Sequence, residues 1–262
     1  MRKKIVLLLS FLSLSSIMYA SEIKLSPQEI DIIGQKVFKN ECASKNEKLI
    51  HYEAASFVSL GIGHFIWYPK DYKGPFEETF PDFLIYAKKS GAKIPDWLNE
   101  GFPPPCPWNS EEAFLRDQKD NKMLELREFL VATKTLQAEF IVKRLDNSLN
   151  RILRNAPREQ RNKIRQNFNR LSANFQGVYI LIDYINFKGL GILPTERYNG
   201  QGWGLLQVLS EMRSDKEAPD AIKEFAETAK KIISERVKNS PQERNEQKWL
   251  PGWIKRIESY TK

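Results

Sequence analysis

The chain has 262 residues, 41% of them hydrophobic, and carries a formal net charge of +8 at pH 7. This length suits one large domain or two small ones and is enough to bury a core. Strand-forming runs are few, which disfavours a Rossmann or sandwich fold. No basic-aromatic nucleic-acid motif accompanies the positive charge, so we expect no nucleic-acid partner.

Residues 1–20 have the three parts of a secretory signal peptide. A basic start, Arg2–Lys4, precedes the run Ile5–Met18, which is almost wholly apolar or serine, and small residues follow. The run is short for a membrane span, and a retained N-terminal anchor is the alternative interpretation. We expect a periplasmic or secreted protein that begins near Ser21 and has no integral membrane segment after cleavage. Its basic charge then favours contact with anionic cell-wall polymers.

The first helix of the mature chain is predicted to run from Pro27 to Glu41. Ser26 and Glu29 have the spacing of a capping box, with the proline at the first helical position. Apolar residues recur with helical spacing as far as Phe38, and Glu41 falls on the same face. A carboxyl on such a face is partly desolvated, which favours the protonated form that a glycosidase acid needs. The competing interpretation is a helix-end glutamate turned toward water.

A segment rich in strand formers, residues 59–68, follows this helix. Its β-branched and aromatic residues suit strands, and its glycines suit a tight hairpin. Glu53 precedes Ser59 by six residues and is expected at the open end of the hairpin, in a wetter setting. Two carboxylates held in different environments are the pattern of a glycosidase.

The run Ser-Leu-Gly-Ile-Gly-His at 59–64 resembles the Thr-Ile-Gly-Ile-Gly-His segment of phage-type lysozymes. The longer run Gly-Ile-Gly-His-Phe-Ile-Trp-Tyr-Pro at 61–69 also resembles exported bacterial proteins with a lysozyme-like fold. The resemblance covers about 25 of the 262 residues. It implies that Glu41 is the general acid and that Glu53 replaces an aspartate that stabilises the oxocarbenium-like state or positions water. It also implies that Ser59 replaces a threonine that helps to hold this water.

Two glycine-containing stretches supply the candidate substrate-binding side chains, one at 61–68 and one at 198–204. Glycines let a backbone approach a ligand closely, and rings with amides suit a sugar. We expect the second stretch to lie across from Glu41. The alternatives are a hydrogen-bonded structural histidine in the first stretch and a packed tryptophan in a helix–helix turn in the second. The candidate residues are His64, Tyr68, Tyr198, Gln201 and Trp203.

The chain has two cysteines, Cys42 and Cys106. In an oxidising compartment such a pair suggests a disulfide, which would hold the proline-rich loop at 103–108 beside Glu41. The alternative is two unpaired thiols. The two histidines are too few for most zinc sites, so we expect no metal and no other cofactor.

These patterns together predict a mainly α, α+β lysozyme-like fold, with a small β-hairpin next to an active-site cleft. We expect residues 21–262 to form a single monomeric domain with a C-terminal helical extension. The predicted function is that of an exported muramidase-like glycosidase whose partner is the glycan strands of peptidoglycan. A lytic transglycosylase with the same acid is one alternative. The other is a non-catalytic wall-glycan-binding protein, which would be favoured by a salt-bridged Glu41.

Overall fold

The computed structural model describes residues 23–53, 57–74, 76–213 and 218–262. The predicted signal peptide at 1–20 lies outside these residues. The mainly α, α+β fold class is confirmed, because long helices surround two small antiparallel sheets. The helices are α1 (Pro27–Cys42), α2 (Phe80–Lys89), α3 (Glu111–Arg116), α4 (Asn121–Ala132), α5 (Lys134–Asn155), α6 (Arg161–Ser172), α7 (Phe175–Lys188), α8 (Leu205–Glu211), α9 (Ala218–Asn239) and α10 (Leu250–Glu258).

The larger sheet has the order β1-β2-β3, with both neighbouring pairs antiparallel. Its strands are β1 (Ile50–Glu53), β2 (Phe57–Leu60) and β3 (Phe65–Trp67). The hairpin predicted at 59–68 therefore corresponds to β2 and β3 with a turn at 61–64, and β1 adds a third strand. The smaller sheet pairs β4 (Arg197–Tyr198) with β5 (Gln201–Gly202).

Helix α1 begins as its sequence predicts. The Ser26 hydroxyl accepts a hydrogen bond from the backbone N–H of Glu29, and the Glu29 carboxylate accepts one from the backbone N–H of Ser26. The helix ends where Ala43 adopts a left-handed conformation, with φ of 52°. Gly34 allows α1 to lie close to α5, because a Cβ at this position would stand 2.9 Å from the Cβ of Ala138.

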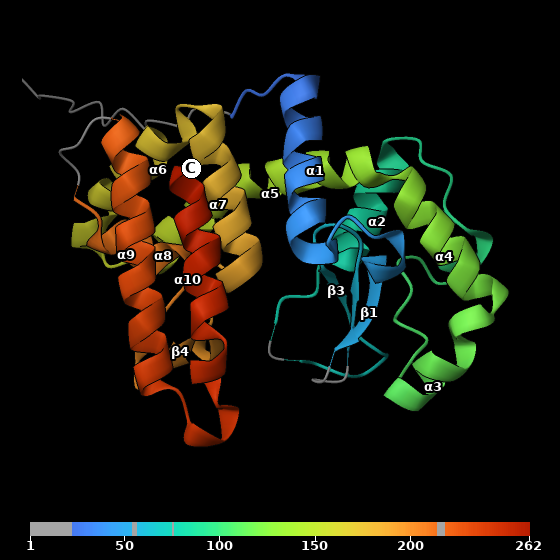
Figure 1. Cartoon of the computed structure of the whole chain (residues 1–262). Helices are drawn as coiled ribbons and strands as arrows, with labels where there is room; N and C mark the ends of the chain where they lie inside the picture. The colour runs from blue at the N-terminus through green and yellow to red at the C-terminus, as the bar shows by residue number, and fades with distance from the viewer. Residues whose placement is uncertain (1–22, 54–56, 75, 214–217) are drawn as a thin grey trace, which may run out of the picture.

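Figure 1 shows how the helices divide into two groups. The three-stranded sheet lies with α2, α3 and α4 on one side, and α6 to α10 gather on the other, with α1 between them. The long helix α5 runs behind both groups and contacts α1, α2, α6 and α7. None of the helices in the described part is both long and apolar enough to cross a bilayer.

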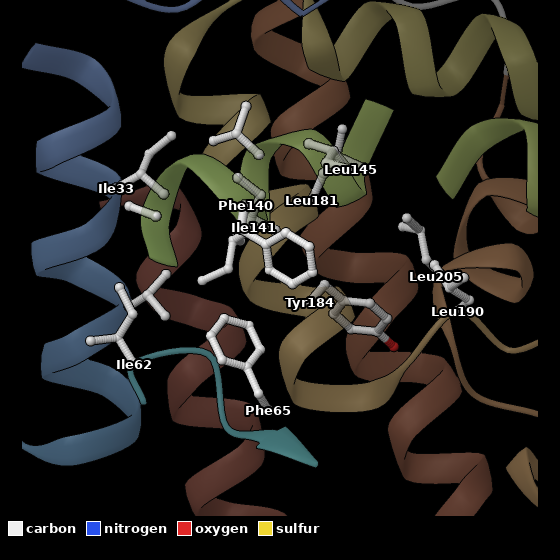
Figure 2. Close-up of a cluster of buried hydrophobic side chains, with 14 of the residues drawn as sticks. Ile33, Ile62, Phe65, Phe140, Ile141, Leu145, Leu181, Tyr184, Leu190 and Leu205 are labelled. Carbon is white, nitrogen blue, oxygen red and sulfur yellow. The ribbon is translucent and has the colours of Figure 1, made fainter. Parts of the chain in front are cut away.

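The buried side chains of the two groups meet along α5. Phe65 of β3 stacks on Phe83 of α2, with ring centroids 5.0 Å apart, and its edge meets Phe140 of α5 at 5.5 Å. Figure 2 shows Phe65 pointing toward Phe140 and Ile141, with Tyr184 of α7 beside them. The strand that carries the glycine-rich turn is therefore held directly against the helix that joins the two groups.

Gln137, a fully buried polar residue of α5, fixes the 61–64 turn. Its Oε1 accepts a hydrogen bond of 2.8 Å from the backbone N–H of Ile62, and its Nε2 donates one of 2.7 Å to the backbone carbonyl of Leu130. Gly61 is required beside it, because its φ is +70° and a Cβ would stand 2.3 Å from Gln137 Oε1. The position of His64 thus depends on one buried amide.

We predict that Gln137→Met lowers the free energy of unfolding by about 2–4 kcal/mol. Methionine fills a similar volume but leaves the Ile62 N–H and the Leu130 carbonyl without this partner. Urea titration measures the change, and Gln166→Met at an exposed position of α6 is the matched control. Equal stability of Gln137→Met and the wild type would contradict the role given to this amide.

Candidate functional site

Glu41 lies in the last turn of α1, and its side chain is 11% exposed. Its Oε1 accepts a hydrogen bond from Nη2 of Arg256, a residue of α10. Its Oε2 lies 3.6 Å from Nδ1 of His64. The structure therefore brings together two predicted residues, Glu41 and His64, with an arginine that lies 215 positions further along the chain.

Arg256 is held by Asp183, which is 1% exposed and sits in the middle of α7. Its Nε and Nη2 donate hydrogen bonds of 2.9 and 2.8 Å to the two Asp183 oxygens. The same carboxylate accepts hydrogen bonds from the Tyr260 hydroxyl at 2.6 Å and from the Asn40 amide at 2.9 Å. Burial by itself lowers the pKa of Arg256, but the hydrogen bonds and charge of Asp183, with the charge of Glu41, raise it above its usual value. The guanidinium stays charged between the two carboxylates.

Sequence reasoning missed both Arg256 and Asp183. The available signal was Asp183 itself, a lone acid within the most apolar helix of the described chain. A buried carboxylate needs a hydrogen-bonded or charged partner, so its position predicts that some cation lies against α7. Nothing in the local pattern around residue 256 identifies that cation as Arg256.

His64 occupies the last position of the β2–β3 turn. It has a left-handed backbone with φ of 46°, and its side chain is 35% exposed. This backbone conformation places the imidazole beside the carboxylate of Glu41, with Nδ1 3.6 Å from Oε2. The sequence allowed two roles for His64, a hydrogen-bonded structural residue and a contact with the substrate. A ring that is one-third exposed suits both roles.

Glu53 and Ser59 lie together on neighbouring strands. Ser59 Oγ donates a hydrogen bond of 2.7 Å to Glu53 Oε1. In the register of β1 and β2, Glu53 stands opposite Phe57 and His51 opposite Ser59, so Glu53 and Ser59 are diagonal neighbours on one face. The carboxylate and the hydroxyl are therefore in direct contact, and Ser59 lies five residues before His64 along the chain.

Tyr68 has a different role from the predicted contact with substrate. Its buried ring meets Phe57 and Tyr72, each at 5.5 Å between centroids. Its hydroxyl hydrogen-bonds both the backbone carbonyl and the backbone N–H of Phe76, each at 3.1 Å. Burial raises the pKa of this phenol. The ring face is occupied by protein, so Tyr68 orders the loop that follows β3.

In the second stretch Tyr198 and Trp203 are packed against α9 and its C-terminal loop. Their rings are 4.5 Å apart, the Tyr198 hydroxyl donates a hydrogen bond of 2.8 Å to Glu246, and Arg236 covers the indole at 4.1 Å. Trp203 is buried, which agrees with the packed-tryptophan alternative. Gln201 remains exposed, and its Oε1 accepts a hydrogen bond of 3.2 Å from Asn239.

A chain of cations and rings connects this stretch with Glu41. The Arg236 guanidinium lies 4.1 Å from the Trp203 ring and 5.1 Å from the Trp253 ring of α10. Trp253 meets Phe187 at 6.3 Å, and Arg256 lies 4.6 Å over Phe187. Arg236 of α9 thus connects the stretch with α10, the helix that supplies the partner of Glu41. These contacts are packing within the protein. The position of residues 198–204 across a cleft from Glu41 stays a prediction.

Of the two alternatives for the cysteines, the structure has the unpaired thiols, and both are buried. Cys42 Sγ lies 3.5 Å from the carbonyl oxygen of Lys48, and Cys106 Sγ lies 3.6 Å from that of Trp108. Burial raises the pKa of Cys42 to about 11 and that of Cys106 to about 12. The proline-rich loop lies beside β3, where the Cys106 N–H donates to the Tyr68 carbonyl at 2.9 Å.

Lys188, at the end of α7, is a third unpredicted residue near this network. Its Nζ lies 3.2 Å from the ring centroid of Trp253 and 4.0 Å from that of Phe187. Burial, followed by the charge of Arg236, lowers the pKa of Lys188 to about 6. The two ring faces act in the opposite direction, because they attract the ammonium form. Desolvation is the larger effect for a buried amine, so we take the amine as largely neutral at pH 7.

In the described ranges, no three His, Cys, Asp or Glu side chains gather closely enough to hold a metal ion. None of the protein-family models, curated proteins and solved structures compared with the chain matches it. The arrangement of Glu41, His64, Arg256, Glu53 and Ser59 therefore has to be interpreted from its own geometry.

We predict that Lys188→Met increases the free energy of unfolding at pH 7 by about 3–5 kcal/mol, because about 3.5 pH units separate pH 7 from the ordinary lysine pKa and each is worth about 1.4 kcal/mol. The pKa of Lys188 is about 6 in the folded protein against 10.5 for an ordinary lysine. The unfolded chain therefore binds the extra proton between these values, and Lys188 lowers stability progressively as the pH falls from 10.5 to 6. The gain from methionine should be largest at pH 6 and below and should vanish above pH 10.5.

Urea titrations across this pH range measure the effect, with Lys255→Met at an exposed position of α10 as the matched control. A loss of stability in Lys188→Met at pH 7 would show that the rings hold a charged ammonium instead.

Proposed function

We propose that this chain is an exported glycan-cleaving enzyme that acts on peptidoglycan, with Glu41 as its general acid. One observation carries the proposal. A largely buried carboxylate ends α1 beside His64, and the turn that supplies His64 closes a sheet on which Glu53 and Ser59 are hydrogen-bonded. Two carboxylates in unlike surroundings, one largely buried and paired and one on a strand with a hydroxyl, suit acid-assisted cleavage of a glycosidic bond.

The proposed acid has to carry a proton, whereas its pair with Arg256 requires the ionised carboxylate. Asp183 resolves this conflict, because it accepts two hydrogen bonds from Arg256. When Glu41 carries a proton, the buried guanidinium of Arg256 is still paired with the Asp183 carboxylate. No unpaired ion is then left in the interior. Glu41 then passes the proton to the glycosidic oxygen as the bond breaks.

Glu53 supplies the second carboxylate. Placed on the sheet, it stabilises the oxocarbenium-like state or orients the attacking water, and the Ser59 hydroxyl fixes one of its oxygens. A lytic transglycosylase needs only the acid, because a sugar hydroxyl replaces water. Product mass separates the two reactions, since the anhydro product is lighter by one water.

The Glu41–Arg256 pair also favours a second candidate, a non-catalytic wall-glycan-binding protein. In that case Glu41 is a structural anion that holds α10 against α1, and no proton transfer is needed. The two candidates differ in one measurable respect: the binding protein retains glycan strands without releasing shorter ones.

We predict that Glu41→Gln lowers cleavage of purified sacculi by roughly 10²–10⁴-fold. Glutamine keeps an oxygen that accepts from Arg256, and Asp183 stays paired, so the thermal midpoint should change little. Released fragments are measured by mass spectrometry. Glu258→Gln, at an exposed position of α10, is the matched control. If wild type binds sacculi and releases nothing, the binding-protein candidate replaces the enzyme.

We predict a smaller loss of activity for Glu53→Gln than for Glu41→Gln in the same assay. The amide oxygen of glutamine still accepts from Ser59, and the substrate's own groups replace part of the electrostatic stabilisation. An equal or larger loss for Glu53→Gln would reverse the proposed order of importance of the two carboxylates.

A further inference from the structure

A groove runs along α4, between this helix and the loop that follows α2, and none of the roles given above uses it. It holds about 660 Å³, a volume in the range of known ligand sites. In Figure 1, α4 lies on the outer side of the helices around the three-stranded sheet, away from α10. The walls of this α4 groove are loop residues 90–96 and the helical side Glu125, Glu128, Phe129, Ala132, Thr133 and Leu136.

The loop runs antiparallel to α4, which defines the two ends of the groove. Lys122, at the start of α4, has its Nζ 5.6 Å from the Trp97 ring centroid, so Asp96 lies beside the first turns of α4. The Tyr86 hydroxyl of α2 donates a hydrogen bond of 3.0 Å to Glu139 of α5, so the loop leaves α2 beside α5. One end of the groove therefore lies by the start of α4 and the other by the start of α5.

The end by the start of α4 is acidic. Asp96 of the loop and Glu125 and Glu128 of α4 line it, and all three side chains are exposed. Among the described residues, no cation lies within ion-pair distance of any of them. Lys93 is the one cation among the described lining residues, although the whole chain carries a net charge of +8. A negative patch on a positive molecule favours a partner that is itself positive at this place.

The end by the start of α5 is apolar and accessible. Ala132 is exposed, and Ala92 and Leu136 are half-buried, so their side chains can contact a ligand. Ile94 and Phe129 are buried beneath them. Small apolar side chains of a partner gain free energy when they leave water for such a surface.

The spacing of the carboxylates suits several separate cations better than one metal ion. In the described ranges, no three acidic, His or Cys side chains gather closely enough to hold a metal. Glu125 and Glu128 are three residues apart on a helix, which sets their Cβ atoms about 5–6 Å apart. The helical side from residue 125 to 136 is about 17 Å long, and an extended segment of about five residues covers this length.

We propose that the α4 groove binds a short extended segment of a partner protein, which has lysine or arginine at one end and small apolar residues at the other. The basic side chains pair with Asp96, Glu125 and Glu128, and the apolar ones cover Ala132 and Leu136. This interaction surface goes beyond the function proposed for Glu41 and does not depend on it. Exposed ion pairs contribute little each, so the binding is weak and weakens further with salt.

Peptide probes test the groove in the full chain. Acetyl-Lys-Lys-Ala-Leu-Ala-amide and acetyl-Ala-Leu-Ala-Lys-Lys-amide carry both charges at one end, in the two possible directions. Acetyl-Lys-Ala-Leu-Ala-Lys-amide has the same composition with a charge at each end. Calorimetry at physiological ionic strength should show the better one-ended peptide binding about fivefold more tightly than the two-ended one. Spermidine, which has no apolar side chains, should bind several-fold more weakly.

Variants of the two ends locate the binding. Glu125→Gln with Glu128→Gln should weaken the better one-ended peptide about tenfold, because two ion pairs are lost. Ala132→Lys should weaken it as well, because a long cationic side chain then fills the apolar end. Glu243→Gln with Glu258→Gln removes the same charge from exposed positions elsewhere and should keep the affinity. Thermal melts show that each variant is folded.

Three outcomes would overturn the proposal: neither one-ended peptide binds, the two-ended peptide binds equally well, or the Glu125 and Glu128 double variant keeps the wild-type affinity. Spermidine that binds as tightly as the peptides would assign the groove to a small polyamine. Self-association in sedimentation velocity that the double variant loses would assign it to a second copy of this chain. Either assignment also overturns the partner segment.

Discussion

The buried charge of Asp183 is the constraint on which the arrangement of the second helical group depends. A carboxylate at the centre of an apolar helix has to be compensated inside the protein. Its partners come from α10, from Tyr260 just beyond α10 and from Asn40 on α1. These hydrogen bonds fix both the height and the rotation of α10 against α7. The place where Arg256 meets Glu41 follows from that fit.

A second ordering device continues from the same helix. Trp253 of α10 has the Lys188 amine 3.2 Å and the Arg236 guanidinium 5.1 Å from its ring centroid, and Arg236 also covers Trp203. Glu246 accepts hydrogen bonds from Arg236 and Tyr198, and the pair with Arg236 holds the pKa of Glu246 below its usual value even though burial alone would raise it. Cations and rings therefore join α7, α9, α10 and the β4–β5 hairpin into one unit. Tyr198 and Trp203, which the sequence suggested as sugar-binding rings, belong to this packing.

Local rules predicted the elements, and long-range packing decided their partners. The capping box at Ser26 and the apolar spacing up to Phe38 were sufficient to place Glu41 at a helix end, and the glycines at 61 and 63 were sufficient to predict the turn before β3. The partners of Glu41 and Trp203 come from α10 and α9, beyond the reach of any local pattern. The cysteines show the same limit, because their number and the expected compartment suggested a bond, whereas both side chains are buried as free thiols.

The distance along the chain between Glu41 and Arg256 also sets the order in which the site matures. A contact across 215 residues is among the most costly to close during folding, because the intervening loop entropy has to be lost first. While the polypeptide is being synthesised, the residues of α1 and the sheet leave the ribosome before those of α10. The carboxylate of Glu41 is then without its guanidinium partner, so the assembled site is a property of the complete fold and is absent from every shorter nascent chain.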